Sequence, residues 1–476
     1  MATTYPIVRL NILGESVTFQ GEDVIEAETV HEIHPIGIEV PASTARVRIW
    51  LDDTVEDENG KTLRDKFKPF GDGVYYQALS KGLPIDIYES VSLEIEDVPE
   101  VYVGRFYLDS WKNPVEGEIE FDCVDAIGVM DNVQYLGRFY ETATPVTTIL
   151  NDIFNYTSLL YVADDTISGK TLSGYLSGNK SLRETLQQVL FAIGAYACTA
   201  GVDCVSIKDK IIPIPGAVLS GFYFDQVGTL FDDALFSDQV TGEIVSDSEK
   251  TDKQSLEIQR PVTSVEVISH DYTKSVAVET IFSSEWLEPG EYLVVYQKPY
   301  WYVRASGVGD RAVYLATAGG ALLGRPDSGT YPDVTILTTY GLFEFGTNFV
   351  RLSVPSPGGA VLVEGSPYVD NTQSFSQENQ EALSSPINKW KISDATLVQA
   401  LNASDVLKNV VDYSKLNYTQ KVTMFPRIDS LLGSIKTFNS LYGNEVVGIV
   451  KKIASDLTGG YLLDTEVIGI ERSVSE

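Results

Sequence analysis

The chain has 476 residues, of which 43% are apolar and 11% aromatic, a composition typical of folded globular proteins. Its 67 acidic residues outnumber 35 basic ones and give a formal net charge of −32, which argues against direct binding to the phosphates of DNA or RNA. A surface along which DNA slides without sticking is expected to be acidic, but so is any well-solvated surface. The length suggests roughly three to four domains.

Cysteine content and the N-terminal residues bear on where the protein is made. Three cysteines provide no disulfide framework and are typical of a protein made in a reducing cytoplasm. The opening MATTYPIVRL has neither a cationic nor a long apolar segment, so we expect no secretory signal. No stretch approaches the roughly 18 to 20 apolar residues of a spanning helix. We therefore expect a soluble protein with no membrane partner.

Residues 1–140 are predicted to form an N-terminal β domain. Alternating apolar and polar residues, with β-branched and aromatic side chains, predict strands at 45–52, 83–90, 101–111 and 116–125. Turn signals separate them, and the segment LRDKFKPFG could form one short helix.

Residues 141–215 are predicted to form a small α+β domain. Thr144 and Pro145 indicate a helix start, with a capping hydroxyl followed by proline at the first helical position. A second helix is predicted from Ser181 and Glu184, which have the spacing of a capping box. Its buried face would carry apolar residues that recur at three- and four-residue intervals: Leu182, Leu186, Val189, Leu190 and Ile193. A hairpin that turns at Gly201 is expected after the helix.

The remaining chain returns to a strand-rich pattern. We expect the first part of a second β domain at 216–304, a β- and loop-rich insert at 305–385, and the closing part of the second β domain at 386–476. The closing part is predicted to contain a helix at 404–416. Within the insert, residues 370–386 resemble an exposed linker or loop, and Asp456-Leu457-Thr458-Gly459-Gly460 is expected to connect two strands of a hairpin.

Few residues are arranged for chemistry. The sequence contains neither a Gly-x-Ser-x-Gly elbow nor a Walker-type glycine loop. His31 and His34 do not match the His-Glu-x-x-His spacing, and Pro35 would break a helix there, so we expect ordinary surface or strand histidines. Cys198 and Cys204 have no nearby histidine and are expected to be buried, reduced thiols. A glycosidase needs only two carboxylates, and 67 acidic residues always offer candidates, but no pair stands out. The sequence therefore predicts no catalytic residue, no metal site and no cofactor.

Two segments are candidates for ligand sites. Read as a calcium loop, the acidic run 51–61 would need ligands at Val55 and Lys66, which cannot coordinate, so a solvated turn closed at Asn59-Gly60 is preferred. The aromatic residues Tyr300, Trp301 and Tyr302 could stack on a sugar ring. Their alternation is equally typical of a β-strand that packs aromatic side chains in a core.

Two stretches resemble the tail hub proteins of phages and prophages of Gram-positive bacteria. GRFYLDSWKNPVEGEIEFDCVDAIGVMDN (104–132) is similar to the strand-turn-strand of that family, which ends in Asp-x-Ile/Leu-Gly, here Asp125 and Gly128. YLSGNKSLRETLQQVLFAIGAYACTAGVDCVSI (175–207) is similar to the helix and hairpin that follow. The matching positions of this helix are Ser181, Arg183, Glu184, Leu186, Gln187 and Gln188. The likeness covers roughly a third of the chain.

The resemblance implies a mainly β (α+β) fold with two β-barrel or β-sandwich domains per chain. In such hubs three chains form a ring of six barrels that joins the tail tube to the spike or tip and surrounds the DNA path. It therefore implies a homotrimer without enzymatic activity in the tail of a virion, made in the bacterial host cytoplasm. The implied partners are other copies of this chain, the tail tube, the spike or tip and other baseplate proteins, with a tape measure protein possible and no sequence-specific nucleic acid. The implied roles of the matched residues are structural.

Two other functions remain open at this point. A receptor-binding or cell-wall-carbohydrate-binding tail protein would use Tyr300, Trp301 and Tyr302 together with the unmatched 300–385 segment. A peptidoglycan hydrolase fused to a hub would need a lytic domain, for which the 305–385 segment offers no His and no Cys.

Overall fold

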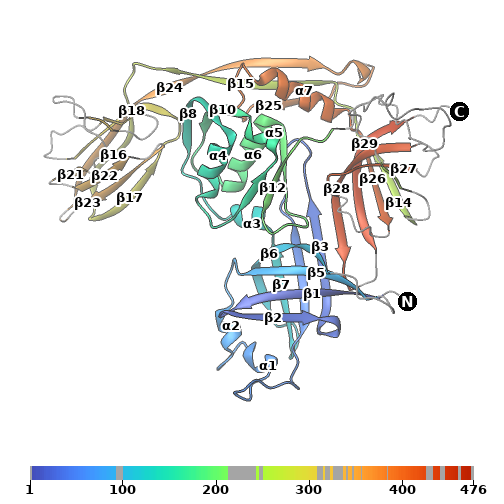
Figure 1. Cartoon of the computed structure of the whole chain (residues 1–476). Coiled ribbons are helices and arrows are strands. Elements are labelled where there is room, and N and C mark those ends of the chain that lie inside the picture. The colour runs from blue at the N-terminus through green and yellow to red at the C-terminus, as the bar shows by residue number, and fades with distance from the viewer. Residues whose placement is uncertain are drawn as a thin grey trace.

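The computed structural model describes residues 3–92, 100–212, 243–245, 250–307, 315–316, 322–324, 336–338, 341–345, 348–354, 356, 358–382, 384–424, 432–439, 445–458 and 462–472. The fold is mainly β: two groups of strands share one sheet, and a small α+β unit lies between these strands and a β-rich insert that extends to one side (Figure 1). None of the helices in these ranges is long and apolar enough to cross a membrane.

The N-terminal group of strands encloses its own apolar core. It consists of β1 (Thr3–Ile12), β2 (Glu15–Gln20), β3 (Val24–Glu32), β4 (Thr44–Trp50), β5 (Pro84–Ser92), β6 (Val101–Lys112) and β7 (Glu118–Val124), with short helices α1 (Leu63–Lys66) and α2 (Val74–Ala78). The strands follow the order β3-β4-β7-β6-β5-β1-β2. Their alternate residues point inward, as in Ala45, Val47 and Ile49 of β4, and bury Phe19, Phe106 and Phe121.

The C-terminal group of strands continues the same sheet. It consists of β13 (Glu243–Val245), β14 (Lys250–Ile258), β26 (Tyr418–Met424), β27 (Ile435–Asn439), β28 (Glu445–Asp456) and β29 (Leu463–Arg472). Strands β14, β26, β29 and β28 lie in that order, and β28 also pairs with β27 and with β3. The turn expected at Gly459-Gly460, between β28 and β29, lies outside the described residues.

The α+β unit contains the largest hydrophobic core. Its elements are α3 (Ala126–Met130), β8 (Arg138–Pro145), α4 (Val146–Phe154), β9 (Tyr161–Ala163), α5 (Asp165–Ser168), β10 (Thr171–Leu176), α6 (Leu182–Ile193), β11 (Ala195–Cys198) and β12 (Val205–Asp209). Helix α7 (Ala403–Ser414) packs its buried Val406 and Val410 into the same core, within two residues of the helix expected at 404–416. Leu186 of α6 is fully buried there.

The insert is a pair of small sheets attached through two long strands. Its elements are β15 (Ser264–Lys274), β16 (Glu279–Leu287), β17 (Gly290–Val295), β18 (Tyr300–Gly307), β19 (Leu315–Ala316), β20 (Leu322–Gly324), β21 (Ile336–Thr338), β22 (Gly341–Phe345), β23 (Phe349–Val354), β24 (Gly359–Glu378) and β25 (Lys389–Ile392). One end of β24 pairs with β16 and β18, and the other end pairs with β15. In Figure 1 it runs from the insert to the side of α7.

Two local predictions are wrong. Residues 370–378 are not a loop, because they form the second half of β24, whose polar side chains face outward while its backbone pairs with β15. Pro145 is not the first residue of α4 but its N-cap, and the Thr144 hydroxyl donates to the Thr142 carbonyl at 2.9 Å. The reason is that β8 continues through Pro145, which pairs with Thr171 of β10.

Candidate assembly surface

The junction between the two groups of strands is an antiparallel pair formed by β3 and β28. Lys452 lies opposite Glu32, and Asp456 lies opposite Glu28. The first half of β28 pairs on this side with β27 and its last five residues pair with β3, while β29 pairs with β28 on the other side. A shift in register between Val450 and Lys452 marks this exchange. One strand thus joins the N-terminal and C-terminal groups into a continuous sheet.

One face of this sheet is charged across both groups of strands. Because side chains alternate along a strand, the register places charged side chains of β3, β4, β6, β7, β26, β28 and β29 on the face opposite the buried N-terminal core. We call this surface the joined face: Glu26, Glu28, Glu32, Arg46, Arg48, Lys112, Glu118, Glu120, Asp122, Lys421, Lys452, Asp456, Asp464 and Glu466. Acidic side chains outnumber basic ones on it.

Ion pairs cross the strands of the joined face. Arg46 contacts Glu120 at 2.7 Å, and Lys112 contacts the same carboxylate at 2.8 Å. Burial alone would raise the pKa of Glu120, but the hydrogen bonds from Lys112 and Arg46 outweigh it and lower that pKa. Glu466 behaves in the same way: burial acts to raise its pKa, and Lys451 at 2.7 Å is the largest of the effects that lower it. These carboxylates therefore stay charged at neutral pH.

Asp125 caps helix α3 at the point where three parts of the chain meet. Its carboxylate accepts hydrogen bonds from the Gly128 backbone N–H at 2.9 Å and from the Thr199 hydroxyl at 2.7 Å, while its own N–H donates to the Ser43 carbonyl at 2.9 Å. Burial raises the pKa of Asp125 against these hydrogen bonds. A Cβ on Gly128 would lie 2.6 Å from Cβ of Val124, so the position requires glycine. The Asp-x-Ile/Leu-Gly motif at the end of β7 is therefore the N-cap and first turn of α3.

The second motif forms the start of α6 and attaches it to the chain after β3. Ser181 and Glu184 make both hydrogen bonds of the predicted capping box. Arg183 donates to the Val40 carbonyl at 2.7 Å, and Gln187 donates to the carbonyl of Ile38.

The two motifs also meet directly. Asp131, which ends α3, accepts from the Ser181 hydroxyl at 3.1 Å and lies 3.3 Å from the Arg183 guanidinium. Six of the seven polar or glycine positions carried by the resemblance therefore lie where α3, α6 and the 38–43 segment meet, next to the ends of β4 and β7. The seventh, Gln188, accepts from the Thr396 backbone N–H at 3.2 Å.

The histidines are more enclosed than expected. His31 lies in β3, as the strand alternative predicted, but it is only 7% exposed, so the surface alternative is wrong for it. Neither of its ring nitrogens has a hydrogen-bond partner in the part of the chain that the structure describes. Burial lowers the pKa of His31 to about 4. Burial, together with Lys451, lowers the pKa of His34 to about 4, and its ring contacts Tyr413.

The acidic loop and the cysteines behave as simple structural features. The Asp57 carboxylate accepts the backbone N–H groups of Asn59 and Lys61, which closes the predicted turn. Cys198 lies opposite Ser206 and is buried as predicted, whereas Cys204 precedes β12 and is only half-buried, so its predicted burial is wrong. All three cysteines are free thiols. Across the described ranges, no group of three or more His, Cys, Asp or Glu side chains is placed to hold a metal ion.

The aromatic run does not form one stacking platform. Tyr300 is buried and donates its hydroxyl to Glu279 at 2.5 Å. Trp301 packs against the cluster of Phe139, Tyr175 and Tyr368, and its indole N–H donates to the Ser275 carbonyl at 2.7 Å. Tyr302 is half-buried beside Trp301. Two of the three proposed sugar-stacking rings are thus packed into the protein itself.

Sequence reasoning did not identify the joined face. Glu28, Glu32, Lys452 and Asp456 belong to strands at opposite ends of the chain, and neither segment alone indicates its partner. The sequence did contain one local signal of this face. Arg46 and Arg48 alternate along β4, and acidic residues alternate in the same way along β7.

Comparisons with known proteins gave no sequence match: no protein-family model matches the chain, and neither does any curated protein. Solved structures with a similar fold include prophage tail protein gp18 from Listeria monocytogenes, at 8% identity and a TM-score of 0.46, over 97% of this chain and 94% of that one. The 43 kDa tail protein of prophage MuSo2 from Shewanella oneidensis has 9% identity and a TM-score of 0.46, over 97% and 98%. A tail protein from Neisseria meningitidis has 7% identity and a TM-score of 0.46, over 97% and 96%.

Proposed function

We propose that this chain is a structural hub of a phage tail or a related injection machine. Three copies form a ring that joins the tail tube to the spike or tip, in a phage or prophage of a Gram-positive bacterium. The observation that carries the proposal is the β3–β28 junction, which sets two groups of strands side by side in one chain. Three such chains would supply six groups of strands around a three-fold axis, as the motifs at Asp125 and Ser181 imply for a hub.

The ends of the shared sheet supply the contacts for ring closure. Within the described chain the path of the sheet ends at β14 on one side and at β2 on the other. A strand edge exposes N–H and C=O groups that pair readily with another chain, and closure of a ring satisfies such edges. Ile258 on β14 is 62% exposed, so an apolar side chain is available at this edge.

The joined face is the part of the ring that we assign to the channel. Its excess of carboxylates, which ion pairs keep charged, would repel DNA phosphates and let DNA pass without binding. The protein would then act without enzymatic activity in the virion tail, in contact with itself, the tail tube, the spike or tip and other baseplate proteins. It would be made in the bacterial host cytoplasm, with no cofactor.

The first experiment measures the mass of the purified protein by light scattering and its place in negative-stain images of particles that carry it. A three-fold ring at the end of the tube is the expected result. Copies away from the tail axis would contradict the hub and favour a receptor- or carbohydrate-binding protein. Ring closure can require the tail tube as a template. If the free protein is a monomer, the particle images therefore decide between the two functions.

A pair of matched variants tests the proposed edge. Ile258→Lys places a charge on β14 and should abolish incorporation into particles while the melting temperature stays unchanged. Val276→Lys is the control, because Val276 is 95% exposed in the turn before β16. Equal incorporation of both variants would exclude β14 from the ring contact.

A further inference from the structure

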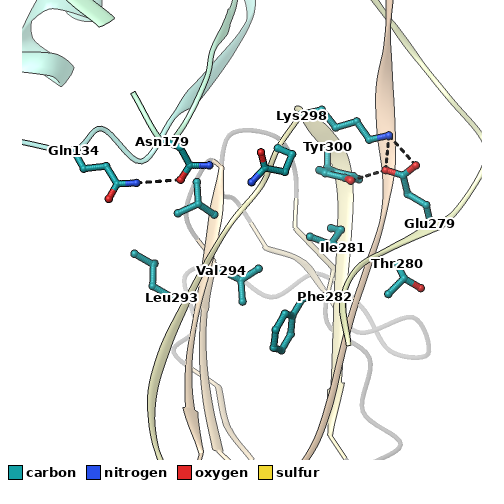
Figure 2. A pocket seen from close by; sticks show the side chains of 12 residues that line it. Gln134, Asn179, Glu279, Thr280, Ile281, Phe282, Leu293, Val294, Lys298 and Tyr300 are labelled. Atoms are coloured by element: carbon teal, nitrogen blue, oxygen red, sulfur yellow. Dashed lines mark hydrogen bonds and ion pairs between the residues drawn. The ribbon is translucent and has the colours of Figure 1, made fainter. Parts of the chain in front are cut away.

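A cavity of about 750 Å³ lies between the insert and the α+β unit (Figure 2). It is separate from the joined face, and at its α+β end it lies beside the start of α6, where Gln134 forms an isolated β-bridge with Ser181. Strands β16 and β17 form its walls, and Gln134 and Asn179 of the α+β unit lie at one end, where the Gln134 amide donates to the Asn179 side chain at 3.0 Å.

The lining contains runs of consecutive residues. Residues 279–282 of β16 and 293–295 of β17 all line the cavity. Successive side chains of a strand point to opposite faces, so a cavity against one face would contact every second residue. In β17, whose register is regular, a run of neighbours therefore means that the cavity opens on the edge of the strand, where the backbone N–H and C=O groups lie. In β16 a register shift between Thr280 and Phe282 interrupts the alternation within the run.

Both edges lack a strand partner on this side within the described part of the chain. β16 pairs with β24 in one sheet, and β17 pairs with β23 in another. The two strands follow each other in sequence but do not pair with each other. An extended segment that enters between them would find backbone donors and acceptors on either side, the arrangement in which a peptide adds a strand to a sheet.

The side chains in the cavity favour an uncharged, partly apolar segment. Ile281, Phe282 and Val294 are half-buried against the core of the insert, so their remaining apolar surface faces the cavity. The single carboxylate in the lining, Glu279, already accepts from Lys298 at 2.7 Å and from Tyr300 at 2.5 Å. The lining is therefore electrically neutral, unlike the chain as a whole.

We propose that this cavity receives an extended segment of another protein of the same tail, which adds as a β-strand between β16 and β17. The segment carries alternating apolar and small polar residues, and about five residues would span about 17 Å of the groove. This proposal rests on the proposed function, because it needs a neighbouring tail protein. It gives the insert a role in attaching that neighbour to the hub.

The test uses the full chain and an array of overlapping ten-residue peptides that covers the other structural proteins of the particle and this chain itself. The wild-type protein should bind a small set of peptides with alternating apolar residues. Leu293→Lys places a charge in the groove and should weaken this binding at least tenfold. Val369→Lys is the matched control, because Leu293 and Val369 are both 47% exposed and Val369 lies on β24 outside the cavity. It should bind like the wild type.

Backbone recognition is tested with the bound peptides themselves. N-methylation of alternate amides removes hydrogen-bond donors without changing the side chains, and one of the two alternating patterns should abolish binding. The proposal is overturned if no peptide binds, if Leu293→Lys binds normally, if both methylated patterns bind, or if only peptides of this chain bind, which would indicate a second copy instead. If peptides bind as expected but particle images show this protein away from the tail axis, the hub proposal is rejected and the proposal of strand addition is kept.

Discussion

Asp456 of β28 lies directly opposite Glu28 of β3, so two carboxylates face each other at the junction that joins the two groups of strands. Like charges directly opposite in an antiparallel pair are destabilising, by about 0.2 to 1 kcal/mol. The same junction has a favourable pair two positions along this face of the sheet, where Lys452 lies 3.2 Å from Glu32.

Asp456→Asn should therefore stabilise the protein by up to about 1 kcal/mol, because it removes the repulsion and leaves the Oδ1 atom that accepts from Thr458. The urea midpoint of unfolding measures the change. Asp456→Ala is the control, since it also loses the Thr458 hydrogen bonds and should be less stable than the asparagine variant. A lower midpoint for Asp456→Asn than for the wild type would contradict the prediction.

Asp125→Ala should destabilise the protein by about 1 to 3 kcal/mol, because the N–H of Gly128 and the hydroxyl of Thr199 lose a buried acceptor. Asp125→Asn should cost clearly less. Its amide oxygen can still accept from Gly128, and it removes a charge that burial disfavours. Thermal melting of both variants compares them, and equal losses would mean that the carboxylate charge itself is needed.

Leu186→Asp should unfold the α+β unit, because an unpaired charge replaces a fully buried side chain at a cost of about 3 to 5 kcal/mol. Lys408→Asp introduces the same side chain at an exposed position of α7 and should leave the melting profile nearly unchanged. Circular dichroism against temperature gives both results. An unchanged profile for Leu186→Asp would show that α6 does not pack as described.

Stability should fall between pH 6.5 and pH 4 on account of His31. Burial lowers the pKa of His31 to about 4 in the folded state, so over this range the unfolded chain binds a proton that the folded chain does not. The stabilisation is fully present above about pH 6.5 and is lost as the pH approaches 4, about 3 kcal/mol in all. The variant His31→Leu should show a flatter pH dependence in urea unfolding, and identical curves would exclude His31 as the cause.

Charge reversal on the joined face should create DNA binding. The test is the double variant Glu28→Lys and Asp122→Lys, which places a cation on each side of Arg46 on the neighbouring strands. The control is the double variant Glu56→Lys and Glu58→Lys, which makes the same change of charge in the 51–61 loop. Gel retardation of duplex DNA at low salt should occur with the first variant, weaken as salt is added, and be absent with the wild type. Equal retardation by the loop variant would show that the face has no special relation to DNA.

Local signals predicted the local structure well. The capping box at Ser181 and Glu184 starts α6, and the alternation in residues 45–52, 83–90, 101–111 and 116–125 marks strands β4 to β7. These elements depend on contacts between residues near in sequence, so a short window contains the information.

Features that depend on distant partners were missed or misjudged. Residues 370–378 are polar enough to resemble a loop, yet β15, about a hundred residues earlier, pairs with them along their full length. His31 is buried because β28 and Phe106 cover it, and neither is near it in sequence. The joined face was missed for the same reason.

Strand β24 determines how a load on the insert would reach the rest of the molecule. All 11 residues of β15 pair with its second half, while its first half runs through the centre of the insert. A pull on the insert along β24 loads that ladder of hydrogen bonds in shear, so the bonds share the force and do not open one after another. Strand β24 would therefore carry a pulling force from the insert to the α+β unit, where it pairs with β15 beside α7.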